Sequence, residues 1–324
     1  MGGILMTGGA GYIGSHAVYA FLDAGHDVVV IDDLSTGARA NLPKEVAFYE
    51  GSVGDRSFME RVIRAHRPEG VLHFAGSVSV PEAVADPVKY YRNNTASGLE
   101  LLDAISAHGV RYVVFSSTAA VYGVPEGVPV AETAPLRPIN PYGWSKLFFE
   151  QQLRDLAAAS GLLYGILRYF NVAGADPKGR TGHSGPAATH LIKVACQVAA
   201  GLRPSMSVFG TDYGTRDGTC VRDFIDVADL ADAHVAVYQH IRATGESVVF
   251  NCGNGRGYSV LEVLRAVESE AGRSLRATYA ARRPGDVPEL VADPSLLFQS
   301  LQWRPKRTFA DTVATALAWE RRGL

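Results

Sequence analysis

The stretch Thr7-Gly8-Gly9-Ala10-Gly11-Tyr12-Ile13-Gly14 follows a short apolar run and precedes a predicted helix. Its glycines at 8, 11 and 14 have the spacing GxxGxxG. In such a loop the first glycine permits a tight turn, the second lets the backbone approach a pyrophosphate, and the third lets the helix pack closely on the strand. The helix N-terminus offers free N–H groups and a partial positive charge to phosphate. The stretch therefore predicts a dinucleotide-binding strand–loop–helix unit, and the alternative is an ordinary glycine-rich turn.

The second predicted strand supports dinucleotide binding because it ends in Ile31-Asp32-Asp33. An acidic side chain at this place accepts hydrogen bonds from the adenosine ribose. The same carboxylate would repel a 2′-phosphate, so NAD is favoured over NADP. Arg39 follows closely and is expected to be a solvated loop charge. Asp32 is predicted to be the stronger ribose ligand, with Asp33 beside it.

Outward from this loop, short β-branched runs alternate with helical stretches, which is typical of a parallel sheet covered by helices. Strands are predicted at 3–6, 28–31, 46–50, 70–74, 112–116 and 163–167, and helices at 12–24, 57–66, 91–108 and 142–158. Beyond residue 171 we expect loops at 173–187 and 210–218, helices at 227–241, 261–271 and 309–321, and a strand at 248–251. The sequence predicts an α/β protein with a Rossmann-type doubly wound parallel sheet in residues 1–170, onto which helix 227–241 packs back. Residues 171–324 are expected to form a smaller α/β substrate domain, too irregular to continue the sheet.

The composition argues against several classes of protein. Lys plus Arg number 31 and Asp plus Glu 33, so the formal net charge is −2, and no basic field for nucleic acid is expected. No run reaches the ~18 apolar residues of a membrane span, and the first residues lack the features of a signal peptide. The three cysteines form no CxxC or Cys/His cluster. They predict reduced thiols, no metal site and a cytoplasmic location.

A second motif, Asn140-Pro141-Tyr142-Gly143-Trp144-Ser145-Lys146, opens a predicted helix. Asn140 suits the N-cap and Pro141 the first helical position, which places Tyr142 and Lys146 on one helix face. Tyrosine is a poor base at its usual pKa of ~10, but a nearby ammonium and a positive nicotinamide favour the phenolate. The preceding strand runs into Ser116-Ser117-Thr118, at the edge where α/β sheets bind ligands. The alternative is a surface tyrosine and lysine that share this spacing by chance.

These residues together resemble the extended short-chain dehydrogenase/reductase family, and within it the UDP-glucose (UDP-galactose) 4-epimerases. The likeness runs from the first strand to the last helix. It is carried further by His73-Phe74-Ala75-Gly76, Tyr90-Tyr91-Arg92-Asn93-Asn94, Arg168-Tyr169-Phe170-Asn171, Phe209-Gly210, Asp217-Gly218-Thr219, Val221-Arg222-Asp223 and Arg282-Arg283-Pro284-Gly285-Asp286.

The resemblance implies a reversible redox reaction at the sugar C4. In that family a tyrosine takes the proton of the 4-hydroxyl while NAD accepts the C4 hydride, and the 4-keto sugar then receives the hydride on its other face. Tyr142 would be the base, Lys146 would hold the nicotinamide ribose, and Thr118 would hydrogen-bond the reacting hydroxyl. The implied cofactor-binding residues are Gly8, Gly11, Tyr12, Ile13, Gly14, Asp32, Asp33, Ser52, Val53, Phe74, Ala75, Gly76, Asn93, Tyr142, Lys146 and Phe170. The implied substrate-binding residues are Thr118, Tyr142, Asn171, His190, Leu191, Val208, Phe209, Arg222, Arg283, Asp286 and Leu290.

Among these residues, Arg222 and Arg283 are expected on the pyrophosphate and Asp286 on the ribose. The alternative for the arginines is ion pairing with Asp223 or Asp286. The resemblance also implies a homodimer through the apolar side of the Tyr142 helix, which carries Phe148, Phe149 and Leu153; packing within the chain is the alternative. His73 is predicted to be a satisfied core histidine, and Asp226 and Asp229 to be helix-capping groups.

Because the sequence departs from the family pattern at several positions, the identity of the substrate's sugar is left undecided. Ser52 stands where an aspartate is common near the adenine, and Thr189 and His190 stand where some relatives have two asparagines. Leu290, at the wall beside the sugar C2, is intermediate in size, so UDP-N-acetylglucosamine remains an alternative substrate. UDP-xylose and UDP-arabinose remain alternatives too, as do a net NAD-dependent dehydrogenase or reductase and a non-catalytic nucleotide sensor. Ala119 and Ala120 replace the acids that related dehydratases and decarboxylases carry after the Thr/Ser, which favours epimerisation.

Overall fold

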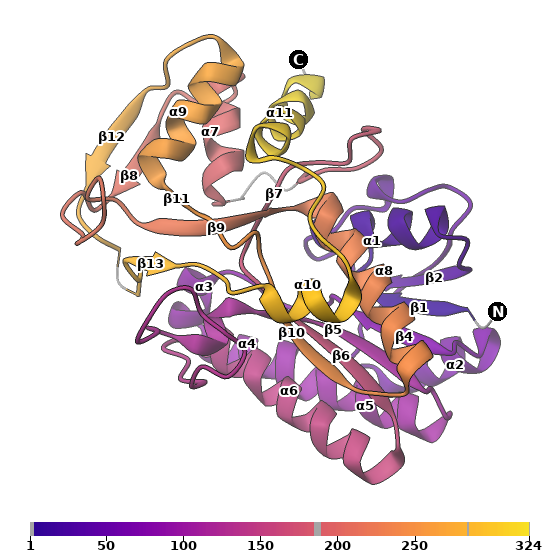
Figure 1. Cartoon of the computed structure of the whole chain (residues 1–324). Coiled ribbons are helices and arrows are strands. Elements are labelled where there is room, and N and C mark those ends of the chain that lie inside the picture. Colours follow the sequence, from indigo (N-terminus) through magenta and orange to yellow (C-terminus); the bar gives the residue numbers. More distant parts are fainter. Residues whose placement is uncertain (1–2, 185–188, 284, 324) are drawn as a thin grey trace. The chain divides into compact units, whose positions relative to one another are not determined.

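The computed structural model describes residues 3–184, 189–283 and 285–323 (Figure 1). The chain forms two compact units, each built from three segments. Unit 1 comprises Met1–Val124, Pro135–Arg168 and Ala231–Phe250, and unit 2 comprises Pro125–Ala134, Tyr169–Leu230 and Asn251–Leu324. Part of the predicted 173–187 loop, Gly185 and Pro186 included, lies outside the described residues, as does Pro284.

Unit 1 is built around a seven-stranded sheet in the order β10-β6-β5-β4-β1-β2-β3. The strands are β1 (Ile4–Thr7), β2 (Val28–Asp32), β3 (Ala47–Glu50), β4 (Gly70–His73), β5 (Tyr112–Thr118), β6 (Leu163–Tyr169) and β10 (Val248–Cys252). The pairs β1–β2, β1–β4, β2–β3 and β4–β5 are parallel. The order 3-2-1-4-5-6 is that of the Rossmann fold, so the predicted fold class is confirmed.

Helices cover both faces of this sheet, which explains why β1, β2, β4 and β5 are buried along their whole length. On one face lie α2 (Arg56–His66), α5 (Ser97–Ala107) and α6 (Pro141–Ser160), packed on a core that includes Val71, Ile105 and Phe149 (Figure 1). On the other face lie α1 (Tyr12–Asp23) and α8 (Val227–Thr244), where the Phe21 and Tyr238 rings are 5.7 Å apart.

The predicted helix at 91–108 is two elements in the structure, a π-helix η2 (Tyr91–Ala96) followed by α5. Among the described residues of unit 1, four short helices were not predicted: η1 (Arg39–Asn41), α3 (Val80–Ala85), α4 (Pro87–Tyr90) and η3 (Ala119–Tyr122). The expectation that the C-terminal part would not continue the sheet was wrong. Strand β10 lies beside β6 at the edge of the main sheet, where its Phe250 and Cys252 are buried.

Unit 2 contains small sheets and a group of three packed helices. Strand β9 (Val221–Asp226) pairs with β7 (Asn171–Ala173), β11 (Gly257–Ser259) and β13 (Glu289–Leu290), while β8 (Met206–Phe209) pairs with β12 (Ala277–Ala280). Helices α7 (Leu191–Ala199), α9 (Val260–Ala271) and α11 (Phe309–Glu320) share one apolar core. Helix α10 (Ser295–Leu301) and η4 (Arg321–Gly323) complete the unit.

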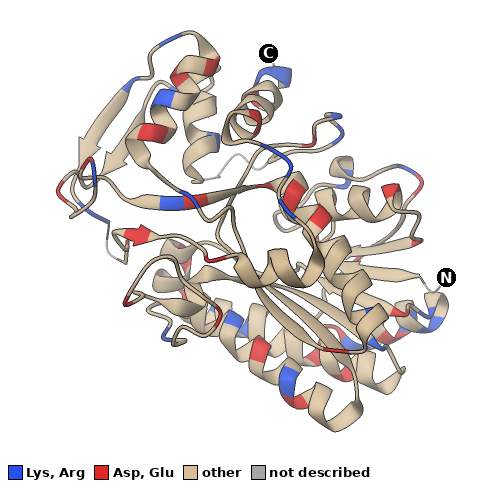
Figure 2. Ribbon diagram, in the orientation of Figure 1, with Lys and Arg blue, Asp and Glu red and all other residues tan. Residues whose placement is uncertain are grey.

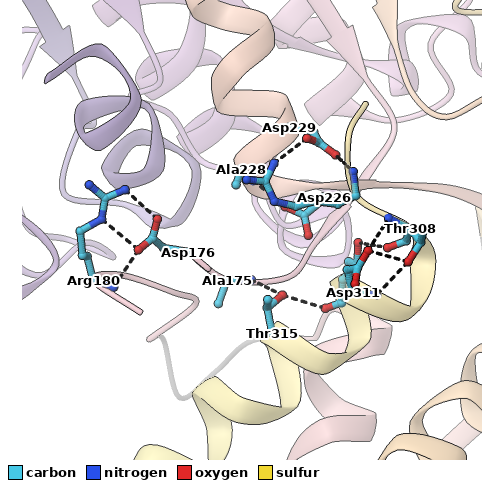
Figure 3. Close-up of polar contacts among 11 residues, drawn as sticks. Ala175, Asp176, Arg180, Asp226, Ala228, Asp229, Thr308, Asp311 and Thr315 are labelled. Carbon is cyan, nitrogen blue, oxygen red and sulfur yellow. Dashed lines mark hydrogen bonds and ion pairs between the residues drawn. The ribbon is translucent and has the colours of Figure 1, made fainter. Parts of the chain in front are cut away.

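Polar groups define where several of these helices begin. Capping boxes start α9 at Ser259 and α11 at Thr308, as Figure 3 shows for Thr308 and Asp311. Asp226 caps α8 by accepting a 2.8 Å hydrogen bond from the Ala228 N–H, as predicted. Asp229 instead binds Arg307, accepting from its main-chain N–H at 2.9 Å and from Nη1 at 2.5 Å.

Charged residues of both signs occur along the helices of each unit (Figure 2). No helix among the described residues is long and apolar enough to cross a membrane. In the same residues, no group of three or more His, Cys, Asp or Glu is placed to hold a metal ion. The three cysteines are free and buried, in agreement with the prediction of reduced thiols.

Candidate active site

The glycine loop of unit 1 joins β1 to α1 and is shaped by close backbone contacts. Gly8 has φ +70°, and a Cβ built on it would lie 2.7 Å from Ala75 Cα. A Cβ on Gly14 would lie 2.8 Å from Gly9 Cα. Around Gly11, by contrast, the only described atom near an added Cβ is the Gly8 carbonyl oxygen, at 3.3 Å. The turn is thus closed behind Gly8 and Gly14 and open at Gly11, as a loop that admits a pyrophosphate requires.

The loop lies at the point where the strand order reverses. From β1 the chain proceeds to β2 and β3 on one side of the sheet and then returns to β4 on the other side. The last residue of β1 is joined to the segment after β4 by a 2.9 Å hydrogen bond from the Phe74 N–H to the Thr7 carbonyl oxygen. Such a switch point is where open α/β sheets bind ligands, and Gly11 opens onto it as the N-cap of α1, without a side-chain cap.

Asp32, at the end of β2, is held against the glycine loop. Its Oδ2 accepts a 2.9 Å hydrogen bond from the Ala10 N–H, and its Oδ1 accepts one of 2.9 Å from the Leu34 N–H. Burial raises the pKa of this carboxyl above its usual value. Asp33 binds its own loop through Ser35, and Ser52 Oγ accepts a 3.1 Å hydrogen bond from the Gly54 N–H. A carboxylate has about four acceptor positions, so Asp32 can still accept a hydrogen bond from a ribose hydroxyl.

The predicted catalytic residues come together at the carboxyl end of β5. Asn140 caps α6 by accepting from the Gly143 N–H at 2.9 Å, and Pro141 occupies the first turn, as predicted. Thr118, Tyr142 and Lys146 are 8%, 7% and 3% exposed. Their burial rules out the alternative of a chance surface pair.

Two hydrogen bonds tie α6 to β5 at this place. The Lys146 ammonium donates a 3.1 Å hydrogen bond to the Ser116 carbonyl oxygen, and the Tyr142 and Thr118 hydroxyls are hydrogen-bonded to each other. A Cβ on Gly76, which follows β4, would lie 3.6 Å from Lys146 Nζ. The segment that carries Gly76 and the helix α6 are therefore adjacent within unit 1.

The electrostatics of the pair differ from the sequence-based expectation. Burial raises the pKa of Tyr142, and the hydrogen bond with Thr118 opposes that rise. Burial lowers the pKa of Lys146 to about 8. The structure does not bear out the expectation that the ammonium lowers the Tyr142 pKa, because desolvation dominates. Thr118 is the side chain that favours the phenolate, and a positive nicotinamide would add to its effect.

Several neighbours of Tyr142 were missed by sequence reasoning. The fully buried Tyr90 ring stands edge-on to the Tyr142 ring, with 6.4 Å between the ring centroids, and the Tyr90 hydroxyl donates a 2.9 Å hydrogen bond to Glu82 Oε2. Ser145 Oγ donates to the Tyr142 carbonyl oxygen at 2.8 Å and accepts from Asn94 Nδ2 at 2.9 Å. Both Tyr90 and Asn94 belong to the Tyr90–Asn94 motif. The sequence therefore showed the motif, but not its contacts with Tyr142 and Ser145.

Two further predictions in unit 1 concern single residues. Asn93 Nδ2 donates a 3.0 Å hydrogen bond to Ser77 Oγ, which places it beside the Gly76 segment. His73 is a satisfied core histidine, as predicted: its Nδ1 lies 2.7 Å from Thr7 Oγ1, and burial lowers its pKa to about 3. Burial of the ring and its contact with Thr7 thus account for His73 without a role in the chemistry of the site.

In unit 2 the structure brings five predicted substrate residues together. Arg222, on β9, faces Leu290, on β13, in the strand register. Arg222 Nη2 lies 4.0 Å from Asp286 Oδ1, and Arg283 Nε lies 3.1 Å from Asp286 Oδ2. The Arg283 guanidinium covers the Phe209 ring at 4.8 Å. Phe209, Arg222, Arg283, Asp286 and Leu290 thus form one cationic group with a single internal carboxylate.

The ion pairing weighed as an alternative for the arginines is present, with Asp286 as the partner. Asp223 is not available for it, because its carboxylate accepts from the main-chain N–H groups of Asn254 and Gly255 at 2.9 Å and of Ala292 at 3.2 Å. Burial raises its pKa to about 6. The pyrophosphate role of the arginines stays a prediction. It is compatible with the ion pairs, because a pyrophosphate carries more negative charge than Asp286 and can replace it as the partner of the arginines.

The other predicted residues of unit 2 lie on separate elements. Phe170 is buried and bonded through its N–H to the Cys252 carbonyl oxygen at 3.2 Å, while Asn171 opens β7 opposite Phe224 of β9. His190 is the N-cap of α7, which begins at Leu191, and Val208 lies in β8. Within the described ranges no hydrogen bond or ion pair joins His190 or Leu191 to the cationic group.

Comparison with known proteins gives a consistent result. Residues 4–253 match the model of the NAD dependent epimerase/dehydratase family. A UDP-glucose 4-epimerase of Azospirillum brasilense is 57% identical over 98% of this chain and 92% of that protein. The crystal structure of a UDP-glucose 4-epimerase from Brucella ovis in complex with NAD has a TM-score of 0.95 and 42% identity, covering 99% of both chains. A Bifidobacterium longum UDP-glucose 4-epimerase in complex with NAD+ and UDP has a TM-score of 0.93 and 41% identity, covering 98% of this chain and 97% of that one.

Proposed function

The chain belongs to the NAD dependent epimerase/dehydratase family, and from this premise we propose that it interconverts UDP-glucose and UDP-galactose by inverting the sugar C4 with bound NAD. The observation that carries the proposal is the buried group of Thr118, Tyr142 and Lys146 beside the open glycine loop. Unit 1 is the proposed NAD-binding domain and unit 2 the proposed UDP-sugar-binding domain.

The residues of unit 1 account for the proton chemistry. NAD supplies a reversible hydride acceptor and a positive ring. Tyr142 takes the proton of the 4-hydroxyl and later returns it, and Thr118 hydrogen-bonds the reacting hydroxyl and stabilises the phenolate. Lys146, fixed on the Ser116 carbonyl oxygen, binds the nicotinamide ribose and adds a positive charge. Asp32 accepts from the adenosine ribose, and the Gly11 turn admits the pyrophosphate.

The protein recognises its substrate mainly through the UDP part. Arg222 and Arg283 bind the UDP pyrophosphate through charge-assisted hydrogen bonds, and Asp286 binds the uridine ribose. The sugar itself must be held loosely, because it presents both faces of C4 to one fixed nicotinamide. Strong binding of UDP combined with weak binding of the hexose is therefore the arrangement that the reaction requires.

Other substrates remain as alternatives, and one residue bears on them. Leu290, opposite Arg222, is smaller than a tyrosine, which leaves N-acetylated UDP-hexoses as candidate substrates. UDP-pentoses remain candidates for a different reason, because none of the motifs recognises the sugar C6. A net dehydrogenase or reductase is the less favoured alternative. Ala119 and Ala120 follow Thr118 in η3, so no acid is present there for elimination or decarboxylation.

We also propose a homodimer and a cytoplasmic location. Leu99 on α5 and Trp144 and Phe148 on α6 are exposed by 51%, 38% and 42%, and the last two rings are 5.6 Å apart. The predicted interface needs correction, because Phe149 and Leu153 are fully buried in the core of unit 1. A Phe148→Asp variant should shift the mass in solution from dimer to monomer, and an unchanged mass would refute this interface. Free buried thiols support the cytoplasmic location.

The test of function is conversion without added cofactor. Purified protein is mixed with UDP-galactose alone, and UDP-glucose should form with no lasting accumulation of NADH. A dehydrogenase would instead stop after one turnover and leave NADH. The same assay with UDP-glucose, the two N-acetylated sugars and UDP-xylose ranks the substrates. Protein that carries no dinucleotide and takes none up would refute the proposal.

A further inference from the structure

A buried ion pair in unit 1 lies next to the residues proposed to be catalytic. Glu150, on α6, and Arg168, on β6, are 0% and 2% exposed. Arg168 donates from Nε to Glu150 Oε1 at 3.0 Å and from Nη2 to Oε2 at 2.6 Å. One guanidinium edge thus meets both oxygens of one carboxylate, a geometry that fixes orientation as well as distance.

The pair is connected to the strand and the turn that carry Thr118. Ser117 Oγ donates to Glu150 Oε1 at 2.6 Å, and Arg168 Nη1 donates to the Tyr122 hydroxyl at 3.1 Å. The Arg168 guanidinium also covers the Tyr122 ring at 5.3 Å. Thr118 lies between these two contacts in sequence, and its Oγ1 accepts from the Ala120 N–H at 3.1 Å. The polar groups of the pair are therefore satisfied by β5 and η3, the elements on either side of Thr118.

On the helix side, Glu150 shares a face with the catalytic residues. Tyr142, Lys146 and Glu150 follow at intervals of four, so they lie one above the other on α6. Each contacts a different residue at the end of β5: Tyr142 the Thr118 hydroxyl, Lys146 the Ser116 carbonyl oxygen, and Glu150 the Ser117 hydroxyl. Three successive turns of α6 therefore each contact one of three neighbouring residues at the end of β5, although not in the order of the strand.

We propose that the Glu150–Arg168 pair is a positioning unit that sets the register of α6 against β5 and thereby holds the Tyr142 hydroxyl on Thr118. A buried pair is weak evidence for stability, because well-packed apolar residues serve stability as well or better. An apolar contact, however, does not specify direction, whereas the two-pronged contact does. The pair acts through Tyr142 and Thr118 and touches no reacting atom. The proposal rests on the proposed epimerase function.

The test uses two variants that leave the buried charges balanced or nearly so. Ser117→Ala keeps the ion pair and disconnects it from β5, and Arg168→Lys keeps the charge and removes the planar fork. Arg154→Ala is the control, because Arg154 approaches the same carboxylate only from the rim, at 3.4 Å and with 35% of its side chain exposed. For each protein we would measure the thermal midpoint, the bound NAD, kcat, KM for UDP-galactose and the pH dependence of kcat.

Both variants should keep their NAD and a KM within about twofold of wild type. Their kcat should fall about 10-fold or more, as expected when an aligned proton-transfer group is misplaced. The acid limb of the kcat profile should move to higher pH, because the Thr118 hydrogen bond that favours the phenolate is loosened. Arg154→Ala should match wild type throughout.

Two results would overturn the proposal. One is a folded, NAD-loaded variant pair with wild-type kcat and pH profile. The other is a loss of activity that only follows the loss of folded protein, with an unchanged pH profile in the fraction that remains folded, since this is what a purely structural role predicts. Wild-type turnover in the same assay tests the epimerase function separately, so the two failures are distinguishable.

Discussion

The Nε of Arg283 lies 3.1 Å from a carboxylate oxygen of Asp286, which places an internal anion where a substrate pyrophosphate is proposed to bind. Arg222 approaches the other oxygen of the same carboxylate at 4.0 Å. The cationic group is thus partly neutralised by its own chain. Because these side chains are partly exposed, each pair contributes only modestly, on the order of 1 kcal/mol or less.

Asp286→Asn should therefore change two affinities in opposite directions. Inorganic pyrophosphate, which lacks a ribose, should inhibit about threefold more strongly because the competing charge is gone. UDP should bind several-fold more weakly because a ribose acceptor is lost. Inhibition constants measured at two salt concentrations check this, and the pyrophosphate effect should shrink at high salt. Asp212→Asn, which breaks the exposed pair of Asp212 with Arg282 at 2.8 Å, is the matched control. A change of both constants in the same direction would refute the counter-ion role.

Tyr142→Phe should lower kcat by about 100-fold or more, the usual range for loss of a general base. The ring keeps its contact with Tyr90, so the variant should retain its fold and its NAD. Since burial raises the pKa of Tyr142, wild-type kcat/KM should rise with pH as the phenolate forms. Tyr49→Phe, which removes a hydroxyl bonded to His66, is the control. Turnover within a few-fold of wild type would show that another group is the base.

Asp226→Asn tests a buried charge at the start of α8 (Figure 3). Burial raises the pKa of Asp226 to about 6, and the guanidinium of Arg307, with its Nε 3.7 Å from Asp226 Oδ1, opposes that rise only in part. Because the folded pKa exceeds the unfolded one, wild-type stability from this group is fully present below about pH 4 and is lost as the pH rises through about 6. A difference of about two pKa units corresponds to about 3 kcal/mol.

The free energy of unfolding of the Asn variant should therefore increase relative to that of wild type as the pH is raised from about 4 to 7. Denaturant unfolding of both proteins at four pH values measures the difference. Asn keeps the oxygen that accepts from the Ala228 N–H, so the cap itself is not the variable. A difference that is flat with pH would mean that the carboxyl titrates normally in the folded protein.

Leu290→Tyr should reduce kcat/KM for UDP-N-acetylgalactosamine more than for UDP-galactose. Leu290 is half-buried opposite Arg222, and a tyrosine there would narrow the space proposed for the sugar C2 substituent. Added bulk in a pocket is worth about 1–3 kcal/mol of discrimination, or 10- to 200-fold. Parallel assays with both sugars measure the ratio, and equal losses for both would remove Leu290 from the sugar wall.

The elements that were predicted correctly share a local signal. Strands β1, β2 and β4 are continuous apolar runs, and α6 begins with Asn140 and Pro141, which fix its start independently of the rest of the fold. The helices α3 and α4 were missed because they are one turn or slightly longer and have no apolar period. Helix α7, which buries Ile192 and Val198, was also not predicted.

It was easier to predict which residues form the site than to predict the polar contacts between them. The sequence motifs predicted that Thr118, Tyr142 and Lys146 would meet, because sheet topology brings strand ends together. The link of Glu150 to Arg168 joins a helix to a strand 18 residues away, and no spacing rule predicts a pairing of that kind. The rise in the Tyr142 pKa was also missed, since desolvation depends on how completely the packed chain excludes water.

The return of the chain at β10 has a consequence during protein synthesis. Unit 1 is complete only when Phe250 has been made, although β6 ends at Tyr169, a separation of 250 − 169 = 81 residues. At the usual elongation rates the β6 edge stays open for about 4–16 s on the ribosome. An unpaired, apolar strand edge is a site of aggregation. We therefore expect nascent chains of this enzyme to depend on chaperones most strongly while residues 170–250 are being added.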